Sequence, residues 1–338
     1  MYASFAVPKI RSLLAACLLS GTAAAQAVPA GLSDAAVAAD LSAARAASPR
    51  PSECSPDGVG RTLWTHWERA RRPQVARYCD ALALGYAELG ATPQRALATA
   101  KRAATLAPGR AAPVVLEARA LVGAGRAREA FTVFARARAI DKRGLADPAA
   151  LHDLAIAALA SGEHLEAVAA YRALVPRAGM LADARVRQRV YLEAAMTVMR
   201  RDPKALDEAL GYLGEARRLR GLPGLSDVVL GATALTLDRQ GRHEEARGVA
   251  AEARGPLGVA GLATAPAAAG GPLVTLPDGE LAAIAAVLTE RTHPELAKKL
   301  WRTFEASAAN AGSPWQAQAK RRAESQAAPV RRWGRPPR

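Results

Sequence analysis

The chain has 338 residues, a formal net charge of +15 at pH 7 and a composition that is 50% hydrophobic but only 4% aromatic. Its length allows two domains or one extended array of repeats. With so few aromatic residues the core must consist mostly of Ala, Leu and Val, whereas strands favour β-branched and aromatic side chains. The composition therefore disfavours a β-sandwich and predicts an all-α fold.

Residues 1–27 have the three-part pattern of a secretory signal peptide. Two basic residues precede an uncharged Ala- and Leu-rich run that is too short to span a membrane, and small residues follow it. Cleavage after Ala25 or after Ala27 would follow an A-x-A triplet. The stretch LLAAC also resembles a lipobox around Cys17, although only five residues separate this cysteine from the preceding arginine. We therefore expect a periplasmic or secreted protein, with a lipoprotein anchored at Cys17 as the alternative.

Residues 28–76 are expected to form a loop and capping helices, because a Pro- and Ser-rich stretch interrupts two segments of helical character. Removal of the signal peptide leaves Cys54 and Cys79, and two thiols in an oxidising compartment can form a disulfide. Such a bond would add about 3 kcal/mol to the free energy of unfolding. The other interpretation is two separate buried thiols. Neither a C-x-x-C motif nor a nearby histidine completes a metal ligand set.

The segment 125–141 predicts an amphipathic helix. Its apolar residues, Phe134 among them, fall on one stripe at about 100° per residue. Arg128, Arg136 and Arg138 lie roughly 100° or more from the centre of that stripe. They are placed to face water, so we do not expect this helix to bind nucleic acid.

The same spacing recurs along the middle of the chain. An alanine stands five residues after Gly125, Gly162 and Gly241, and the position four residues further holds Phe134, Tyr171 and Ala250. Two weaker copies, TPQRALATAKRAATLAPG and DPKALDEALGYLGEARRL, keep this frame. The equivalent alanines are Ala96, Ala130, Ala167, Ala209 and Ala246. Their separations are 34, 37, 42 and 37 residues.

A further predicted helix precedes each copy, as in CDALALGYAELG and APVVLEARALVGAG. Each unit is then a helical hairpin, which buries its apolar face only by stacking on its neighbours. The units resemble tetratricopeptide repeats (TPR), in which a small residue opens the second helix of a unit of about 34 residues. The resemblance covers residues 77–254 as five repeats and implies a right-handed superhelical α-solenoid. The usual Trp and Leu-Gly-x-x-Tyr signature is missing, and after an insertion the fourth unit's first helix is expected near 187–199.

Residues 255–277 are rich in Gly, Ala and Pro and are expected to form a flexible or irregular linker. Residues 278–326 follow as a degenerate hairpin, in which Ala297 and Trp301 repeat the alanine-aromatic spacing, and a polar capping helix. We expect residues 327–338 to be a basic disordered tail. Seven basic residues and one acidic residue lie between 320 and the C-terminus, so contact with an anionic envelope surface is the alternative.

No catalytic pattern emerges from the sequence. The stretch HEEAR at His243 is not a zinc-binding H-E-x-x-H motif, because Arg247 stands where the second histidine would be. The other histidines also lack a partner at metal-ligand spacing. Neither a G-x-S-x-G elbow, a Walker loop nor a dinucleotide-binding G-x-G-x-x-G is present. We therefore expect a non-enzymatic protein with no catalytic residues, cofactor or metal.

The resemblance implies that the first helices of the repeats line a concave surface that binds a protein or peptide. The groove-facing candidates are Tyr78, Glu88, Arg119, His152, Asp153, Asp238 and Arg239. They are mixed in charge and lack the Lys/Asn set with which relatives clamp a C-terminal carboxylate. These features imply an exported scaffold or adaptor that mediates protein–protein interaction in the cell envelope. The alternative is an accessory or regulatory subunit of an envelope enzyme or of a secretion or assembly machine.

Overall fold

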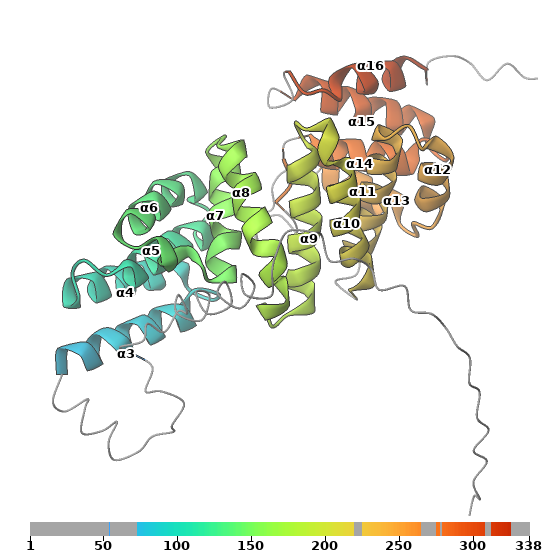
Figure 1. Cartoon of the computed structure of the whole chain (residues 1–338). Helices are drawn as coiled ribbons and strands as arrows, with labels where there is room; N and C mark the ends of the chain where they lie inside the picture. Colours follow the sequence, from blue (N-terminus) through green and yellow to red (C-terminus); the bar gives the residue numbers. More distant parts are fainter. Residues whose placement is uncertain are drawn as a thin grey trace, which may run out of the picture. The chain divides into compact units, whose positions relative to one another are not determined.

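The structure, a computed structural model, consists of helices and their connections in every part of the chain that it describes (Figure 1). The described residues are 54, 73–219, 225–264, 275–277, 279–307 and 312–325. All regular elements within them are α- or 3₁₀-helices, so the predicted all-α class is confirmed there. The predicted signal peptide 1–27, nearly all of 28–76 and the tail 327–338 lie outside the described residues.

Helices α3 to α12 form five consecutive pairs. The pairs are α3 (Pro73–Glu88) with α4 (Pro93–Leu106), α5 (Ala111–Gly123) with α6 (Ala127–Ile140), α7 (Pro148–Ala160) with α8 (His164–Leu174), α9 (Ala184–Met199) with α10 (Leu206–Arg218), and α11 (Leu225–Arg239) with α12 (His243–Ala251). The second helix of each of the first four pairs also packs against the first helix of the next pair. Short 3₁₀ turns lie at Lys142–Leu145, Val175–Met180 and Pro203–Ala205.

The five repeat alanines occupy one structural position. Each is the fourth residue of the second helix of its pair, and each is at most 3% exposed. Ala297 holds the same place in α15 (Pro294–Ala306). Residues four apart share one face of a helix, and Phe134, Tyr171 and Leu213, one turn after three of these alanines, are fully buried. A small side chain followed by a large one thus recurs in the core of successive pairs.

Three of the turns between paired helices have the same backbone. Gly125, Gly162 and Gly241 have φ angles of 76°, 80° and 80°, a region that side chains other than glycine rarely tolerate. Each glycine donates its N–H to the carbonyl three residues back, and the next residue donates to the carbonyl five residues back. This is the Schellman motif, and it ends the first helix of the pair at a fixed residue.

The fourth pair begins earlier than the sequence predicts. Helix α9 starts at Ala184 instead of near 187, and it ends at Met199 as expected. The side chain of Asp183 accepts a hydrogen bond from the N–H of Arg185 and so caps the new start. The insertion before it contains the 3₁₀ turn Val175–Met180.

The predicted linker 255–277 is not irregular over its first part. Residues 256–264 form α13 (Pro256–Thr264), which packs against α14 (Glu280–Thr289). The carboxylate of Asp227 accepts hydrogen bonds from the backbone N–H groups that precede the helix. Val259 and Ala260 are buried, and this burial outweighs the loop-like composition. The linker prediction is therefore wrong for these residues.

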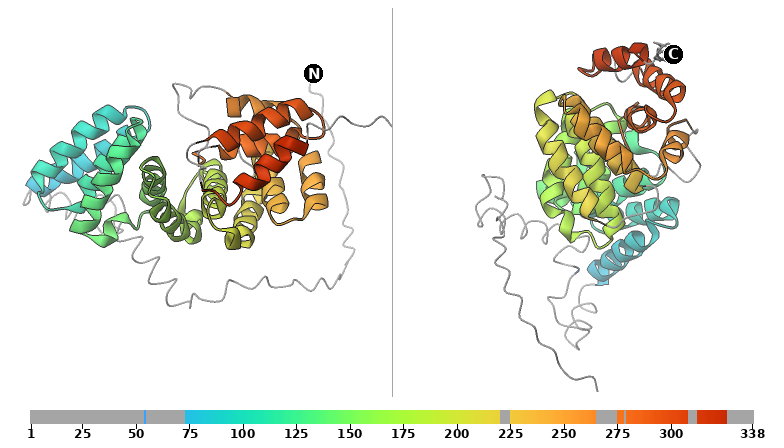
Figure 2. Two further views of the ribbon diagram at one scale, coloured as in Figure 1. Left: turned by 90° about the horizontal axis from the view of Figure 1, so that it is seen from above. Right: turned by 90° about the vertical axis from the view of Figure 1, so that its right-hand side faces the viewer.

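The last described helices close the core around α11. Helix α14 packs against α11 and α13, α15 packs against α14, and α16 (Gln316–Ser325) packs against α15 (Figures 1 and 2). Trp315, just before α16, is buried and donates its Nε1–H to the carbonyl of Met199 at 2.9 Å. No helix among the described residues is long and apolar enough to cross a membrane.

Cys54 and Cys79 are joined by a disulfide, with their Cα atoms 5.2 Å apart. Cys79 lies on α3, and both cysteines pack against the buried cluster that contains Tyr78 and Leu82. The bond closes a loop between positions 25 residues apart in the sequence. It therefore ties residue 54 to the first helical pair.

Candidate functional site

The groove candidates on α3 take part in the packing of the first pair. Tyr78 is 2% exposed and belongs to the core between α3, α4 and α5. Glu88 accepts a hydrogen bond of 2.8 Å from the hydroxyl of Thr99 on α4. Tyr78 is therefore structural, and Glu88 is already engaged by a neighbouring helix.

The candidates on α5 and α7 pair with each other. Arg119 donates from Nε to Asp153 at 2.7 Å and lies 3.5 Å from Asp147 through Nη1. Its guanidinium also lies 5.6 Å from the ring centroid of Tyr86 on α3. Burial raises the pKa of Asp147, and Arg119 partly opposes this effect. Arg119 and Asp153 thus join successive first helices, with their charges neutralised.

The candidate His152 leads to a carboxylate that the sequence did not single out. Its Nε2 shares a hydrogen bond of 2.6 Å with Glu193, a fully buried residue of α9. Glu193 also accepts from Arg189 at 2.8 Å, from Tyr171 at 3.2 Å and from the backbone N–H of Thr275. Burial raises the pKa of Glu193, but the facing His152 and Arg189 outweigh it and hold the pKa below its ordinary value.

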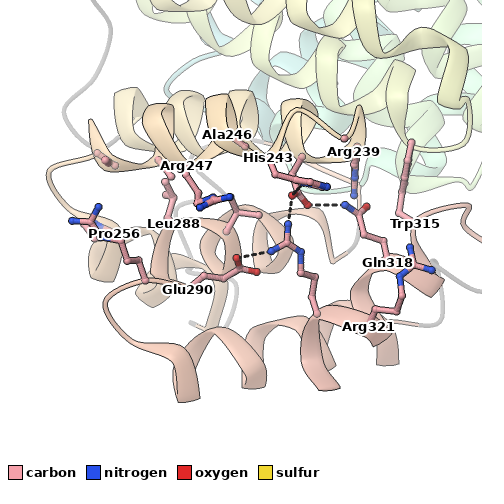
Figure 3. A pocket seen from close by; sticks show the side chains of 18 of the residues that line it. Arg239, His243, Ala246, Arg247, Pro256, Leu288, Glu290, Trp315, Gln318 and Arg321 are labelled. Carbon is pink, nitrogen blue, oxygen red and sulfur yellow. Dashed lines mark hydrogen bonds and ion pairs between the residues drawn. The ribbon is translucent and has the colours of Figure 1, made fainter. Parts of the chain in front are cut away.

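The last two candidates, at the end of α11, line an open pocket of about 990 Å³ (Figure 3). Asp238 is 3% exposed and accepts hydrogen bonds from His243 at 2.7 Å, from Gln318 at 2.6 Å and from Arg322. Arg322 also donates to Glu290 at 3.0 Å. These bonds tie α11, α12, the end of α14 and α16 into one polar network.

Arg239 forms the second buried contact at this pocket. Its Nη2 donates to Glu280 of α14 at 2.9 Å, and both side chains are at most 1% exposed. The guanidinium also lies 4.9 Å from the ring centroid of Trp315, which favours a cation–π contact. Its Nε and Nη1 are buried without a hydrogen-bond partner among the described residues. Figure 3 shows this side chain between His243 and Trp315.

The remaining lining divides into apolar walls and a basic rim. The walls include four alanines and a proline from the α12–α13 region, two apolar residues of α14, and residues at the start of α16. They are Ala246, Ala250, Ala251, Ala253, Pro256, Val287, Leu288, Pro314, Trp315 and Ala317. The rim carries the exposed arginines Arg247, Arg291 and Arg321.

Ala250 explains why the pocket is open. It stands where α6, α8, α10 and α15 carry the buried Phe134, Tyr171, Leu213 and Trp301. Helix α4 also has an alanine there, Ala100, but α4 packs against α5 and that alanine is fully buried. Helix α12 makes only a small contact with α14. The alanine in the aromatic position is a sequence signal for this pocket, but Ala100 carries the same signal and is fully buried, so the sequence alone did not locate it.

No protein-family model matches the chain. No curated protein matches its sequence either. The described residues contain no group of three or more His, Cys, Asp or Glu side chains arranged to hold a metal ion. The pocket combines apolar walls, a basic rim and buried N–H donors, which is the chemistry of binding an amphipathic anionic ligand.

Proposed function

We propose that the protein is an exported, non-enzymatic scaffold or adaptor that binds another protein in the cell envelope. In this proposal the helical pairs stack as a right-handed superhelical α-solenoid of TPR-like repeats. The observation that carries it is the recurrence of one buried alanine as the fourth residue of six second helices. Stacked hairpins of this kind expose long surfaces suited to protein binding.

The polar groups of the first helices favour a structural role over catalysis. Arg119 with Asp153, His152 with Glu193, and Arg239 with Glu280 each join two first helices. Side chains held in such buried pairs orient the helices, and their hydrogen-bonding groups are engaged within the protein. This supports recognition through an extended surface and through the pocket at α12.

Export is supported by two independent features. The first is the signal-peptide pattern of residues 1–27. The second is the disulfide between Cys54 and Cys79, because such bonds persist mainly in oxidising compartments. Mass spectrometry of the protein from a bacterial periplasmic fraction tests this. We expect a chain that begins at Gln26 or Val28, and a lipid on Cys17 would contradict the soluble form.

Cross-linking in the cell tests the binding function. The full chain with a C-terminal affinity tag is cross-linked in intact cells, purified under denaturing conditions and analysed by mass spectrometry. We expect one or a few envelope proteins to be enriched over a signal-peptide-deleted control that stays in the cytoplasm. If no envelope protein is enriched over this control, the scaffold proposal fails.

A further inference from the structure

We propose that the pocket between α12, α14 and α16 binds an acidic peptide segment of a partner protein, and that it takes one bulky apolar side chain of that segment beside Ala250. The inference rests on the proposed function, because it assumes a protein partner. It adds the place of contact and the chemistry of the ligand.

The space beside Ala250 can take an apolar side chain from a ligand. In four other second helices this position holds a buried Phe, Tyr, Leu or Trp, which fills the gap to the neighbouring helices. Here the side chain is a methyl group, and Val287 and Leu288 also line the open pocket of about 990 Å³. A side chain from another molecule can therefore occupy the space that the chain's own residue fills elsewhere. Ligand pockets typically measure about 300–1,000 Å³.

The rim around this space is positively charged. The carboxylates that line it, Asp238 and Glu290, are both bonded to Arg322. At the rim, Arg291 and Arg321 are exposed and form no ion pair with another described residue. The internal acids are thus neutralised while the rim stays cationic. A ligand with carboxylates on either side of its apolar residue would match this distribution.

Two N–H donor groups of Arg239 have no hydrogen-bond partner among the described residues. They are those of Nε and Nη1, which are buried beside Trp315. Buried polar groups are normally hydrogen-bonded. The Oε1 of Glu280, in the same ion pair, is also without a partner in the described part of the chain, and both side chains are at most 1% exposed, so a ligand atom meets these groups only if the pair shifts toward the pocket. A peptide carbonyl or carboxylate oxygen has the required chemistry. Neither the small residues of α12 nor the rim arginines would by themselves predict such an acceptor.

The walls of the pocket are preformed. Helix α16 is held by the hydrogen bonds of Trp315 to Met199 and of Gln318 and Arg322 to Asp238. A preformed site loses less entropy when it binds. The polar network of Asp238, Gln318 and Arg322 also lines the pocket, and a peptide offers it amide groups whereas a lipid chain offers none. These features favour a peptide over an anionic lipid.

A selection on the full mature chain tests the ligand chemistry. A random dodecapeptide library displayed on phage is the probe, and enriched sequences are synthesised with a fluorescein label. We expect enriched peptides to carry Glu or Asp around one large apolar residue. Replacement of that residue by Ala should weaken binding at least about tenfold in fluorescence anisotropy. No enrichment, or enrichment of basic peptides, would overturn the proposal.

Variants of the pocket test the place of contact. Ala250→Trp introduces the side chain that α15 has as Trp301, and Ala250→Leu introduces the one that α10 has as Leu213. Either substitution should weaken the selected peptide at least about tenfold, because the pocket is then filled from within. Melting curves by circular dichroism establish that each variant folds. Peptide binding that is unchanged in both folded variants would overturn the proposal.

Arginine variants test the rim. The double substitution Arg291→Glu with Arg321→Glu should weaken the peptide about tenfold or more at low salt and reduce the salt dependence of its affinity. The double substitution Arg95→Glu with Arg102→Glu on α4 is the matched control, because it makes the same change in net charge and both residues are exposed and absent from the pocket lining. Equal losses in the double variant and in the control would mean that only net charge matters, and this contradicts a rim site.

Two further measurements separate the ligand class and the underlying function. Binding to phosphatidylglycerol vesicles that Ala250→Trp abolishes would assign the pocket to lipid and overturn the peptide proposal. The in-cell cross-linking experiment is then repeated with Ala250→Trp. Partners captured equally by this variant and the wild type would leave the scaffold function intact but remove the pocket from it. Loss of the partner in the variant supports both.

Discussion

The second helices α6 and α12 show opposite solutions at one repeat position. In α6 the large side chain of Phe134 is fully buried, and the helix packs against α7. In α12 the equivalent residue is Ala250, and the helix touches α14 only slightly. The closed pair, α5–α6, fills this space with its own side chain and gains stability. The open pair, α11–α12, leaves the space beside Ala250 to the proposed ligand. Ala100 of α4 is fully buried although it is equally small, so the pocket at α12 depends both on the missing large side chain and on the small contact of α12 with α14.

The largest expected effect comes from making the closed pair resemble the open one. Phe134→Ala should lower the free energy of unfolding by about 3–5 kcal/mol, because it leaves a cavity in a packed core. Urea unfolding followed by circular dichroism measures this loss. Two alanine-to-leucine substitutions at the same repeat position, one in α12 and one in α4, are the control. Ala250→Leu should be neutral or stabilising, whereas Ala100→Leu at the fully buried equivalent in α4 should cost about 1–3 kcal/mol by overpacking.

Reduction of the disulfide should separate the two ends of the chain. Loss of the Cys54–Cys79 bond is expected to cost about 3 kcal/mol, because the unfolded chain regains the entropy of the open loop. Hydrogen exchange with and without reductant is the measurement. Faster exchange is expected in α3 and α4, and the rates in α11 to α16 should not change. A uniform increase along the chain would contradict this local effect.

The carboxylates of Glu193 on α9 and of Glu290 at the α12 pocket should change the stability of the protein in opposite directions as the pH falls. The pKa of Glu193 is lowered by His152 and Arg189 against the effect of burial, so its stabilising contribution is fully present above its unfolded pKa and is lost as pH falls through the folded pKa. Burial raises the pKa of Glu290 despite Arg322, so its ionisation destabilises the folded state as pH rises from the unfolded pKa to the folded pKa.

Glutamine substitutions at these two positions isolate the effects. Glu193→Gln should cost about 1.5–3 kcal/mol at neutral pH, because hydrogen bonds to a charged group are lost, and it should flatten the acid limb of the stability curve. Glu290→Gln should instead remove the loss of stability that accompanies ionisation. Unfolding free energies measured from pH 3 to pH 7 compare the two. If both variants change the slope of the free energy of unfolding against pH in the same direction, the two carboxylates do not differ in this way.

The smallest effect is expected from the surface arginines of α6. Arg138 forms an ion pair with Glu166 of α8, and both side chains are about two-fifths exposed. Arg138→Ala should therefore change the free energy of unfolding by no more than about 0.5 kcal/mol. A thermal melt measures this change. The exposed rim arginines Arg291 and Arg321 should be equally unimportant for stability, so a loss of binding in their variants would report on the ligand alone.

The sequence predicted the features that are fixed locally. The glycine turns and the alanine frame depend on residue size and backbone conformation, which act over a few residues. Partners across the helices were not predictable in this way. His152 pairs with Glu193 and Arg239 pairs with Glu280, each 41 residues away, and both carboxylates lie within runs that read as apolar helix. Which residues meet there depends on insertions and helix tilts that composition does not specify.

The error at α13 has a similar origin. Residues 256–264 look like a linker because they are rich in Gly and Ala, and their burial depends on α14, which begins 16 residues after α13 ends. Of the seven groove candidates, Asp238 and Arg239 line the pocket, and their residue types gave no reason to prefer them. The sequence signal for the pocket was instead the missing aromatic residue at position 250, a signal that the fully buried Ala100 shares.

The hydrogen bond from Trp315 to Met199 has a consequence for how the chain melts. In a linear array each unit touches only its neighbours, and unfolding can start at either end and move inward. This bond connects residues 116 positions apart and returns the last helix to the end of α9. We therefore expect α9 to α16 to open together in one cooperative step, while the α3–α4 end frays by itself once its cross-link is removed. Trp301 and Trp315 both lie in this unit, so a variant that keeps only these two of the chain's five tryptophans would report that step by fluorescence.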